Sequence, residues 1–227
     1  MHISDGYLPA QAWAGGYALT GLLTWHSLRQ IEKEPDPTAN IPKAALLAAV
    51  FFLASSFKLP LPPTSVNPLL NGLLGIMLGY YAFPAILVGL FFQAAMFQHG
   101  GLTTLGLNAL TAGIPALLVY HLFQLKYVLR LKNQIWDGLF GFAAGFLGVA
   151  LTTIFIFGLL LGAVAVGDRS ALDINGLLSS LVIAHIPLML AEGVFTALVA
   201  IFLGKVKPDL LMRLPKRRFT TEEQSLK

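Results

Sequence analysis

The sequence contains no cysteine, and charged residues make up only 11% of its 227 residues. The lack of cysteine excludes a disulfide framework, a thiolate metal site and a cysteine nucleophile. A soluble domain carries about 25% charged residues, so this chain cannot cover a water-exposed surface with polar groups. Its hydrophobic content of 56% also excludes a disordered protein, because disorder requires low hydrophobicity and high net charge. An integral membrane protein is the class that remains.

Several functional motifs are also missing. The opening MHISDGYLPAQAW lacks the basic region and Ala-x-Ala site of a cleaved signal peptide, so we expect the mature chain to begin at Met1. No G-x-x-x-x-G-K-[ST] motif, HExxH motif or catalytic triad occurs. These absences predict a protein that is not an enzyme and has no ATPase site. The net charge of +4 lies at the borders of apolar runs and forms no basic patch, so we expect a lipid bilayer and no nucleic acid as partner.

Long apolar runs predict one all-α domain over residues 1–227, a single bundle of about seven transmembrane helices. The third and fourth runs span only about 20 Å at the rise of an α-helix, so a re-entrant pair is the alternative and would leave the ends of the chain on the same sides. The predicted spans are Pro9–Leu28, Lys43–Phe57, Pro68–Ala82, Pro84–Phe97, Leu102–Leu125, Ile135–Gly167 and Ile174–Gly204.

Lysine and arginine are distributed unequally between the two sets of loops. Of the 15 such residues, only Lys58 and Arg169 lie on the side that also holds the N-terminus. The positive-inside rule then places the N-terminus outside the cell membrane and the C-terminus in the cytoplasm. The basic segment Lys205–Lys227 is predicted to be a cytoplasmic tail. The outer face then holds residues 1–8, 58–67, 98–101 and 168–173.

Met1 and His2 are the most informative pair of residues. A bulky residue at position 2 should preserve Met1, so its amine is followed directly by an imidazole. The amine, the deprotonated backbone nitrogen of His2 and its Nδ1 can close two fused chelate rings in one plane. Such square-planar nitrogen ligation favours Ni(II) or Cu(II), and the need for deprotonated ligands makes binding depend on pH. The alternative is a frayed terminus with no ligand role.

Four more residues on the predicted outer face are candidates for the same site. His99 is either an exposed loop residue or a pocket wall and substitute ligand. Asp5 either accepts a hydrogen bond from a loop or coordinating group or caps the first helix. Thr64 and Ser65 are interpreted as hydroxyls that fix their loop, with contact to the site as the alternative.

Glu192 is the one acid expected well inside a span, where an ionisable group is costly and marks a functional candidate. His185 lies seven residues earlier and on nearly the same helix face. We interpret Glu192 as a hydrogen-bond partner between helices or a coupling residue, with a second metal or proton site as the alternative. His26 and His121 are placed near the cytoplasmic helix ends and are not site candidates.

Three segments together carry a family resemblance: MHISDGYLP at the start, TSVNPLLNGLLG from Thr64 and FQHGGLTTLGLNAL from Phe97. In these motifs the chain resembles the CbiM/NikM family, the substrate-specific (S) components of energy-coupling-factor (ECF) type cobalt and nickel importers. The resemblance implies an outward-facing pocket in which the terminal amine, the His2 nitrogens and a histidine of a T-S-V-H loop surround Ni(II) or Co(II) as transported substrate. It also implies a coupling membrane subunit, two ATPase subunits and often a small additional membrane subunit. No prosthetic group is implied.

The chain departs from the family pattern at Asn67, which stands where the T-S-V-H loop has histidine. Three interpretations remain open: the Asn67 oxygen closes the site with lower affinity, His99 supplies the missing imidazole, or the site prefers another ion or no longer supports transport. Two other functions also stay open. One is a related subunit that has lost metal binding, and the other is an intramembrane metalloenzyme built on His99, His185 and Glu192.

Overall fold

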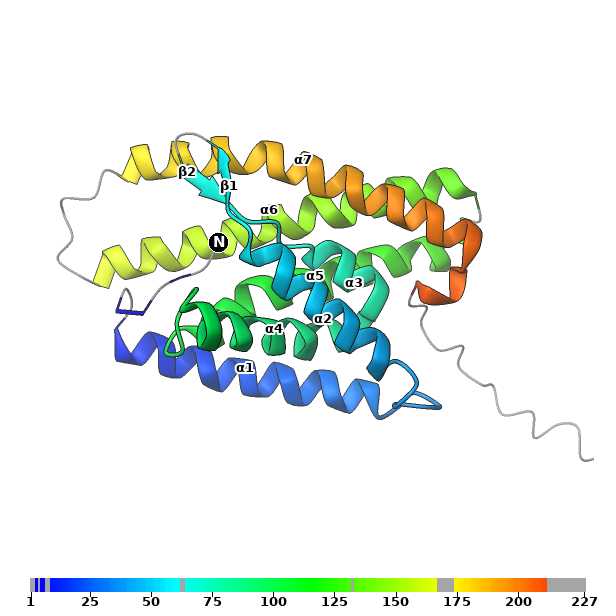
Figure 1. Ribbon diagram of the computed structural model, residues 1–227, viewed down its shortest axis with the longest axis horizontal. Helices are drawn as coiled ribbons and strands as arrows, with labels where there is room; N and C mark the ends of the chain where they lie inside the picture. The colour runs from blue at the N-terminus through cyan, green and yellow to red at the C-terminus, as the bar shows by residue number, and fades with distance from the viewer. Residues whose placement is uncertain are drawn as a thin grey trace, which may run out of the picture.

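The computed structural model describes residues 3, 5–6, 9–61, 64–131, 133–166 and 174–211. Within these ranges the fold is helical apart from one antiparallel hairpin of two short strands. Figure 1 shows α6 and α7 side by side on one flank of the bundle, α1 on the opposite flank and α3 between them. The elements are α1 (Ala10–Ile31), α2 (Ile41–Ser56), β1 (Leu59–Leu61), β2 (Thr64–Val66), α3 (Asn71–Leu78), η1 (Gly79–Tyr81), α4 (Ala82–Phe97), α5 (Leu105–Val128), α6 (Gln134–Val166), α7 (Ile174–Val206) and η2 (Pro208–Leu210).

Helices α3 and α4 form a hairpin. The side-chain nitrogens of Asn67, before α3, and His99, after α4, lie 3.5 Å apart, whereas a straight helix through 71–97 would hold its ends about 40 Å apart. The chain turns at Gly79, whose φ of 57° is a backbone conformation that favours glycine. At the tip of this hairpin, the Tyr81 hydroxyl donates to the carbonyl of Pro37 over 2.8 Å, in the loop that joins α1 to α2. The pair therefore runs from one end of the bundle to the other and back.

Four stretches of the described residues are long and apolar enough to cross a membrane: Asn71–Phe97, Leu105–Val128, Gln134–Leu159 and Ile183–Val206. The first of these is the α3–α4 hairpin, and α2 is apolar but shorter. Membrane insertion is thus supported by length and composition. The count of seven crossings and the sidedness of the termini stay predictions.

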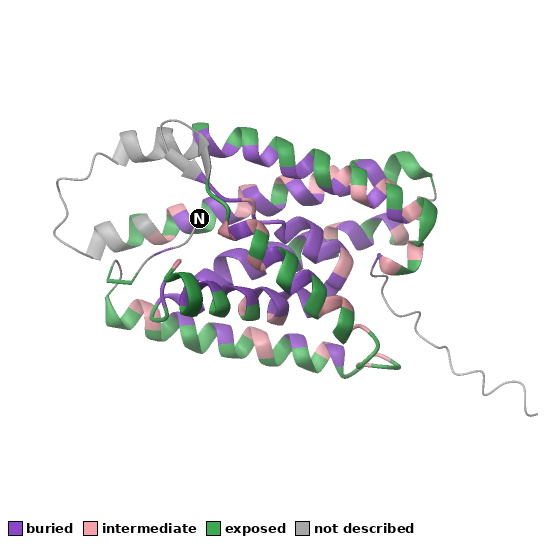
Figure 2. Cartoon of the chain, in the orientation of Figure 1, coloured by how far each residue is buried: buried purple, intermediate pink, exposed green. Residues whose placement is uncertain are grey.

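Helix α3 is the most deeply buried helix, and all but one of its eight residues are inaccessible to solvent. Figure 2 shows this buried centre enclosed by helices whose outward faces are exposed. A Cβ atom at Gly72 would run into the α6 backbone at Ala144, and one at Gly75 would run into the α5 backbone at Ala116. Small residues allow such close approach of helices in the absence of a hydrophobic driving force. This packing against α5 and α6 fixes α3 and therefore the loop that precedes it.

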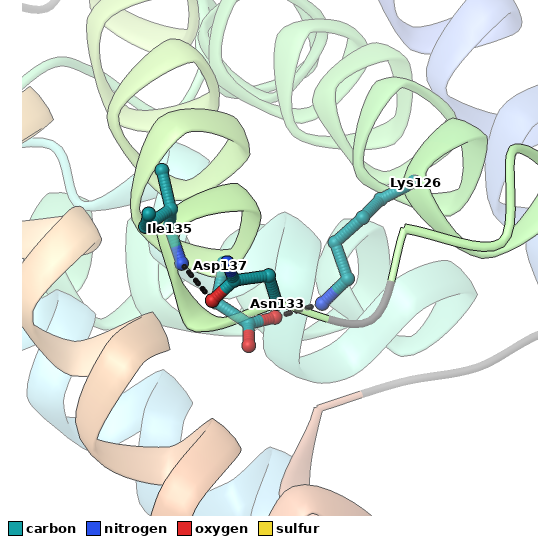
Figure 3. Close-up of polar contacts among 4 residues, drawn as sticks. All are labelled: Lys126, Asn133, Ile135 and Asp137. Atoms are coloured by element: carbon teal, nitrogen blue, oxygen red, sulfur yellow. Dashed lines mark hydrogen bonds and ion pairs between the residues drawn. The ribbon is translucent and has the colours of Figure 1, made fainter.

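The end of the bundle opposite Asn67 and His99 is held by a buried ion pair between Lys126 of α5 and Asp137 of α6 (Figure 3). Lys126 is 4% exposed and Asp137 is 7% exposed. The ammonium group also lies over the ring of Tyr127, 4.5 Å from its centroid. Asp137 is in the first turn of α6, where a negative charge suits the helix dipole. In the same turn, Asn133 Oδ1 accepts a hydrogen bond from the backbone N–H of Ile135.

Replacing Lys126 alone tests this pair. Lys126→Met leaves the buried Asp137 carboxylate without its cation, so we expect a loss of about 3–5 kcal/mol of stability. Adding Asp137→Asn removes the unpaired charge and should recover most of the melting temperature in detergent. Lys205→Met, at an exposed position of α7, is the control and should have little effect. Equal melting temperatures for the single and the double variant would contradict the interpretation.

Candidate functional site

The candidate site lies at the end of the bundle where α2 ends, α3 begins and the α4–α5 loop returns. Met1 and His2, the predicted chelating pair, lie outside the described residues, as do the side chains of Thr64 and Ser65. Within the part of the chain that the structure describes, no three His, Asp or Glu side chains gather in a way that could hold a metal ion. A complete site of this kind therefore needs ligands beyond those described.

Ile3, the residue after His2, is fixed to the start of α5. Its backbone N–H donates to Asn108 Oδ1 over 2.8 Å, and Asn108 Nδ2 donates back to the Ile3 carbonyl over 3.0 Å. The Thr104 hydroxyl donates to the same carbonyl over 2.6 Å. The Ile3 side chain is 5% exposed. The Asn108 amide thus satisfies both the backbone N–H and the carbonyl of Ile3 and fixes the position of this residue.

Asp5 orders the loop before α5. Its carboxylate accepts hydrogen bonds from the Thr103 backbone N–H over 3.1 Å and from the Thr103 hydroxyl. It also lies against Gly101, where an added side chain would collide with it. The alternative that Asp5 caps the first helix is wrong, because α1 has Pro9 at its N-cap and no side-chain cap bond. Ile3 and Asp5 therefore both contact residues 101–104, and His99 lies two residues before that stretch.

Asn67 is buried, and its amide has a fixed orientation. Nδ2 donates to the Ser55 carbonyl over 2.7 Å, at the C-terminal end of α2. Because a carbonyl oxygen only accepts, this bond identifies the nitrogen and leaves Oδ1 as the atom available to another group. Gln93 of α4 fixes the same helix end, since its Nε2 donates to Ser55 Oγ over 2.5 Å and to the Phe52 carbonyl over 3.0 Å.

His99 faces Asn67, as the prediction of a shared face requires. Its Nε2 lies 3.5 Å from Asn67 Nδ2, and its backbone N–H donates to the Gln93 carbonyl over 3.2 Å. Gln98 ends α4 in the left-handed conformation, with a φ of 51°. Burial lowers the pKa of the His99 imidazole, and the charge of Lys58 lowers it further. The lowered pKa favours the neutral ring, which is the form that can bind a metal ion.

Within the described ranges, the hydrogen-bond partners of the Glu192 side chain on α7 are backbone groups of a loop. Its carboxylate accepts hydrogen bonds from the backbone N–H groups of Leu69 and of Leu70, the latter over 3.0 Å. The predicted bond between helices is thus a bond from a helix to the loop that follows Asn67. His185, on the same helix, is 1% exposed.

Sequence reasoning missed several polar residues that build this region. Asn71 is completely buried, and its Nδ2 donates to Thr152 Oγ1 over 2.8 Å and to the Gly148 carbonyl over 3.1 Å, both on α6. Asn108, Ser55 and Gln93 were also not singled out. A signal existed for the two asparagines, because both lie within the family motifs and a buried amide inside an apolar run requires partners.

Comparison with known proteins identifies the family. Residues 2–210 match the cobalt uptake substrate-specific transmembrane region, CbiM. The chain belongs to the CbiM family. A protein of Haemophilus influenzae, provisionally named as a metal transport protein, is 32% identical over 216 residues that cover 94% of this chain and 98% of that protein.

Two further proteins that are similar to this chain support its assignment to the CbiM family. The cobalt transport protein CbiM of Clostridium tetani is 32% identical over 214 residues, covering 90% of this chain and 85% of that protein. A crystal structure of a transition metal transporter superposes with a TM-score of 0.73 at 26% identity, covering 91% of this chain and 93% of the other. These relatives are named as transport proteins, and the match extends over almost the whole fold.

The attachment of Ile3 to Asn108 can be tested directly. Asn108→Ala removes both amide bonds and leaves two buried backbone groups of Ile3 with fewer partners, at a cost of about 1–3 kcal/mol. We expect the Ile3 amide hydrogen to exchange faster with solvent, measured by hydrogen–deuterium exchange of the N-terminal peptide. Asn40→Ala, at the other end of the bundle, should leave that exchange unchanged. Equal protection in Asn108→Ala and in the unmodified chain would contradict the attachment.

Proposed function

We propose that this chain is the substrate-binding membrane component of an ATP-driven importer for Ni(II) or Co(II). The observation that carries the proposal is the meeting of Asn67 and His99, with side-chain nitrogens 3.5 Å apart, beside the loop that fixes Ile3 and Asp5. The residues ahead of Ile3 are Met1 and His2, whose nitrogens are the proposed ligands. Membership of a cobalt uptake family supports the same substrate class.

The proposed donor set is the Met1 amine, the two nitrogens of His2 and Asn67 Oδ1. Asn67 is suited to this role because its nitrogen is engaged by the Ser55 carbonyl, which leaves the oxygen for the ion. An amide oxygen is a harder and weaker donor toward nickel than an imidazole nitrogen. The site should therefore hold nickel less tightly than a site with four nitrogen donors, with His99 as a neutral imidazole close by.

The proposed orientation places this site outside the cell and the Lys126–Asp137 end in the cytoplasm. The alternation of the helices supports it, since Asn67 and His99 share one end while the tip of the α3–α4 hairpin contacts the α1–α2 loop at the other. Of the lysine and arginine residues that the structure describes, all but Lys58 belong to the second end, which the positive-inside rule assigns to the cytoplasmic side. Seven crossings with an external N-terminus follow from this arrangement.

Transport then needs partners that supply energy, because the sequence has no phosphate-binding loop. An ion would enter from outside, exchange its water for the nitrogen ligands and be closed in by the loop that ends at Asn67. Two ATPase subunits and a coupling membrane subunit, with a small additional membrane subunit, would reorient this protein and release the ion inside. The metalloenzyme alternative is not favoured, because both oxygens of Glu192 are engaged by the backbone of the loop.

The first test is metal retention. The purified chain with an authentic Met1 is equilibrated with limiting Ni(II) and Co(II) together, and bound metal and the visible spectrum are measured after removal of free ions. We expect about one ion per chain with the absorption of a site rich in nitrogen donors. His2→Ala, and a chain carrying one extra residue before Met1, are the matched controls and should both lose the ion.

A second function has one observation in its favour. Asn67 replaces the histidine of the T-S-V-H loop, which is the change expected of a related subunit that no longer binds metal. Retention of neither ion by the unmodified chain would support this non-binding subunit and reject the importer. Retention that persists in His2→Ala would reject the terminal chelate as the site.

Asn67→His tests the fourth ligand position. An imidazole can donate one ring N–H to the Ser55 carbonyl and ligate through the other nitrogen, so we expect tighter nickel binding by about tenfold or more. Competition titration against a chelator measures the change. If the affinity does not increase, position 67 does not contact the ion.

A matched pair of histidine variants then separates the roles of Asn67 and His99. His99→Ala should weaken binding strongly only if His99 is itself the fourth ligand, and modestly if it only packs against Asn67. His121→Ala, which removes an imidazole at the opposite end, should leave the affinity unchanged. A loss in His99→Ala together with no gain in Asn67→His would assign the fourth position to His99.

A further inference from the structure

Glu192 connects α7 to the segment that presents Asn67. Asn67 is followed by Pro68, and the next two backbone N–H groups, of Leu69 and Leu70, both donate to the Glu192 carboxylate. The partners are 123 and 122 residues apart in the sequence. The carboxylate therefore joins the last helix of the bundle to a loop near the middle of the chain.

The two bonds offset the cost of burying a carboxylate. Glu192 is 3% exposed, and an isolated charge in such surroundings is strongly unfavourable. Hydrogen bonds from two N–H groups to an ionised carboxylate are about twice as strong as neutral ones. The N–H groups also lie at the N-terminus of α3, where the helix dipole favours a negative charge. Both carboxylate oxygens of Glu192 are thus satisfied by the backbone of this loop.

The segment held by Glu192 has a strained backbone between two fixed points. On one side, Val66 is completely buried against Val149 of α6 and Leu188 of α7. On the other side, Asn71 is bonded to α6. Between them, Leu70 has a φ of 49°, a left-handed conformation that costs a residue with a side chain about 1–2 kcal/mol. The bond from the Leu70 N–H to Glu192 stabilises this conformation.

We propose that Glu192 is a positioning residue for the ion site: from α7, its carboxylate holds the backbone that follows Asn67, so that Asn67 Oδ1 is presented to the ion. This role rests on the proposed function. Glu192 does not itself contact the ion. It acts through the two backbone bonds, as residues that orient metal ligands do.

Glu192→Gln tests the role with little change in volume. The amide keeps one accepting oxygen but places an NH2 group toward the second N–H, so one of the two bonds is lost along with the charge. We expect nickel affinity to fall by about 10- to 100-fold, as for other residues that orient metal ligands, with a shifted visible band. The matched control is Thr196→Val, one turn further along α7, which replaces a buried hydroxyl that has no hydrogen-bond partner among the described residues.

The readouts separate positioning from a purely structural role. A merely structural Glu192 would lower the melting temperature of the metal-free protein but leave the affinity and visible band of the folded fraction unchanged, and that result overturns the proposal. Equal nickel affinities and equal visible bands in Thr196→Val and Glu192→Gln would also overturn the proposal. If the unmodified chain binds no ion, the proposed function fails first, and this role fails with it.

A measurement on the unmodified chain covers the case in which Glu192→Gln does not fold. The amide hydrogens of Leu69 and Leu70 should exchange as slowly as those of the buried helix α3, although they precede it. Exchange at the rate of an open loop would show that the carboxylate does not hold them, and would overturn the proposal without reference to any ion.

Discussion

The structure depends on satisfying backbone hydrogen-bonding groups where helices are broken inside an apolar bundle. In a bilayer core no water is available to such groups, so irregular backbone is tolerated only where protein supplies partners. Residues 68–70, between Asn67 and α3, are of this kind, and Ile3 at the start of α5 has the same need of partners. Side chains with fixed geometry supply the partners: Asn108 for both backbone groups of Ile3, and Glu192 for the N–H groups of Leu69 and Leu70.

The same bonds fix the described backbone next to the proposed ligands. Asn67 bonds to the end of α2, and the residues after it bond to α7 and α6. The N-terminal segment is held by the start of α5 through Ile3 and Asp5. Four different helices thus fix the two segments that carry proposed ligands. Ligand groups held in this way lose little freedom when an ion binds, which favours binding over a flexible terminus.

Sequence reasoning anticipated the membrane class and the family of the protein. Apolar runs gave the helices, and the structure brings together Asn67 and His99, which sequence reasoning had placed on one face. Sequence reasoning could not identify the hydrogen-bond partners of Asp5 or Glu192, because both bind residues about 100 or more positions away in the sequence. A helix cap is a local pattern that a sequence can suggest, whereas a carboxylate that binds a distant loop depends on how the helices pack. Asn71 and Asn108 were overlooked for the same reason, since their partners lie on other elements.

Asn67 can make the same hydrogen bond to Ser55 that a histidine at this position would make. A neutral imidazole has one N–H that can donate to the Ser55 carbonyl and one bare nitrogen that can ligate an ion. The Asn67 amide divides its atoms in the same way, since Nδ2 donates to Ser55 and Oδ1 is left for the ion. The structural bond is therefore preserved, while the donor atom changes from nitrogen to oxygen. With Asn67 Oδ1 as the proposed fourth ligand, we expect the harder oxygen donor to reduce the preference of the site for nickel over harder ions.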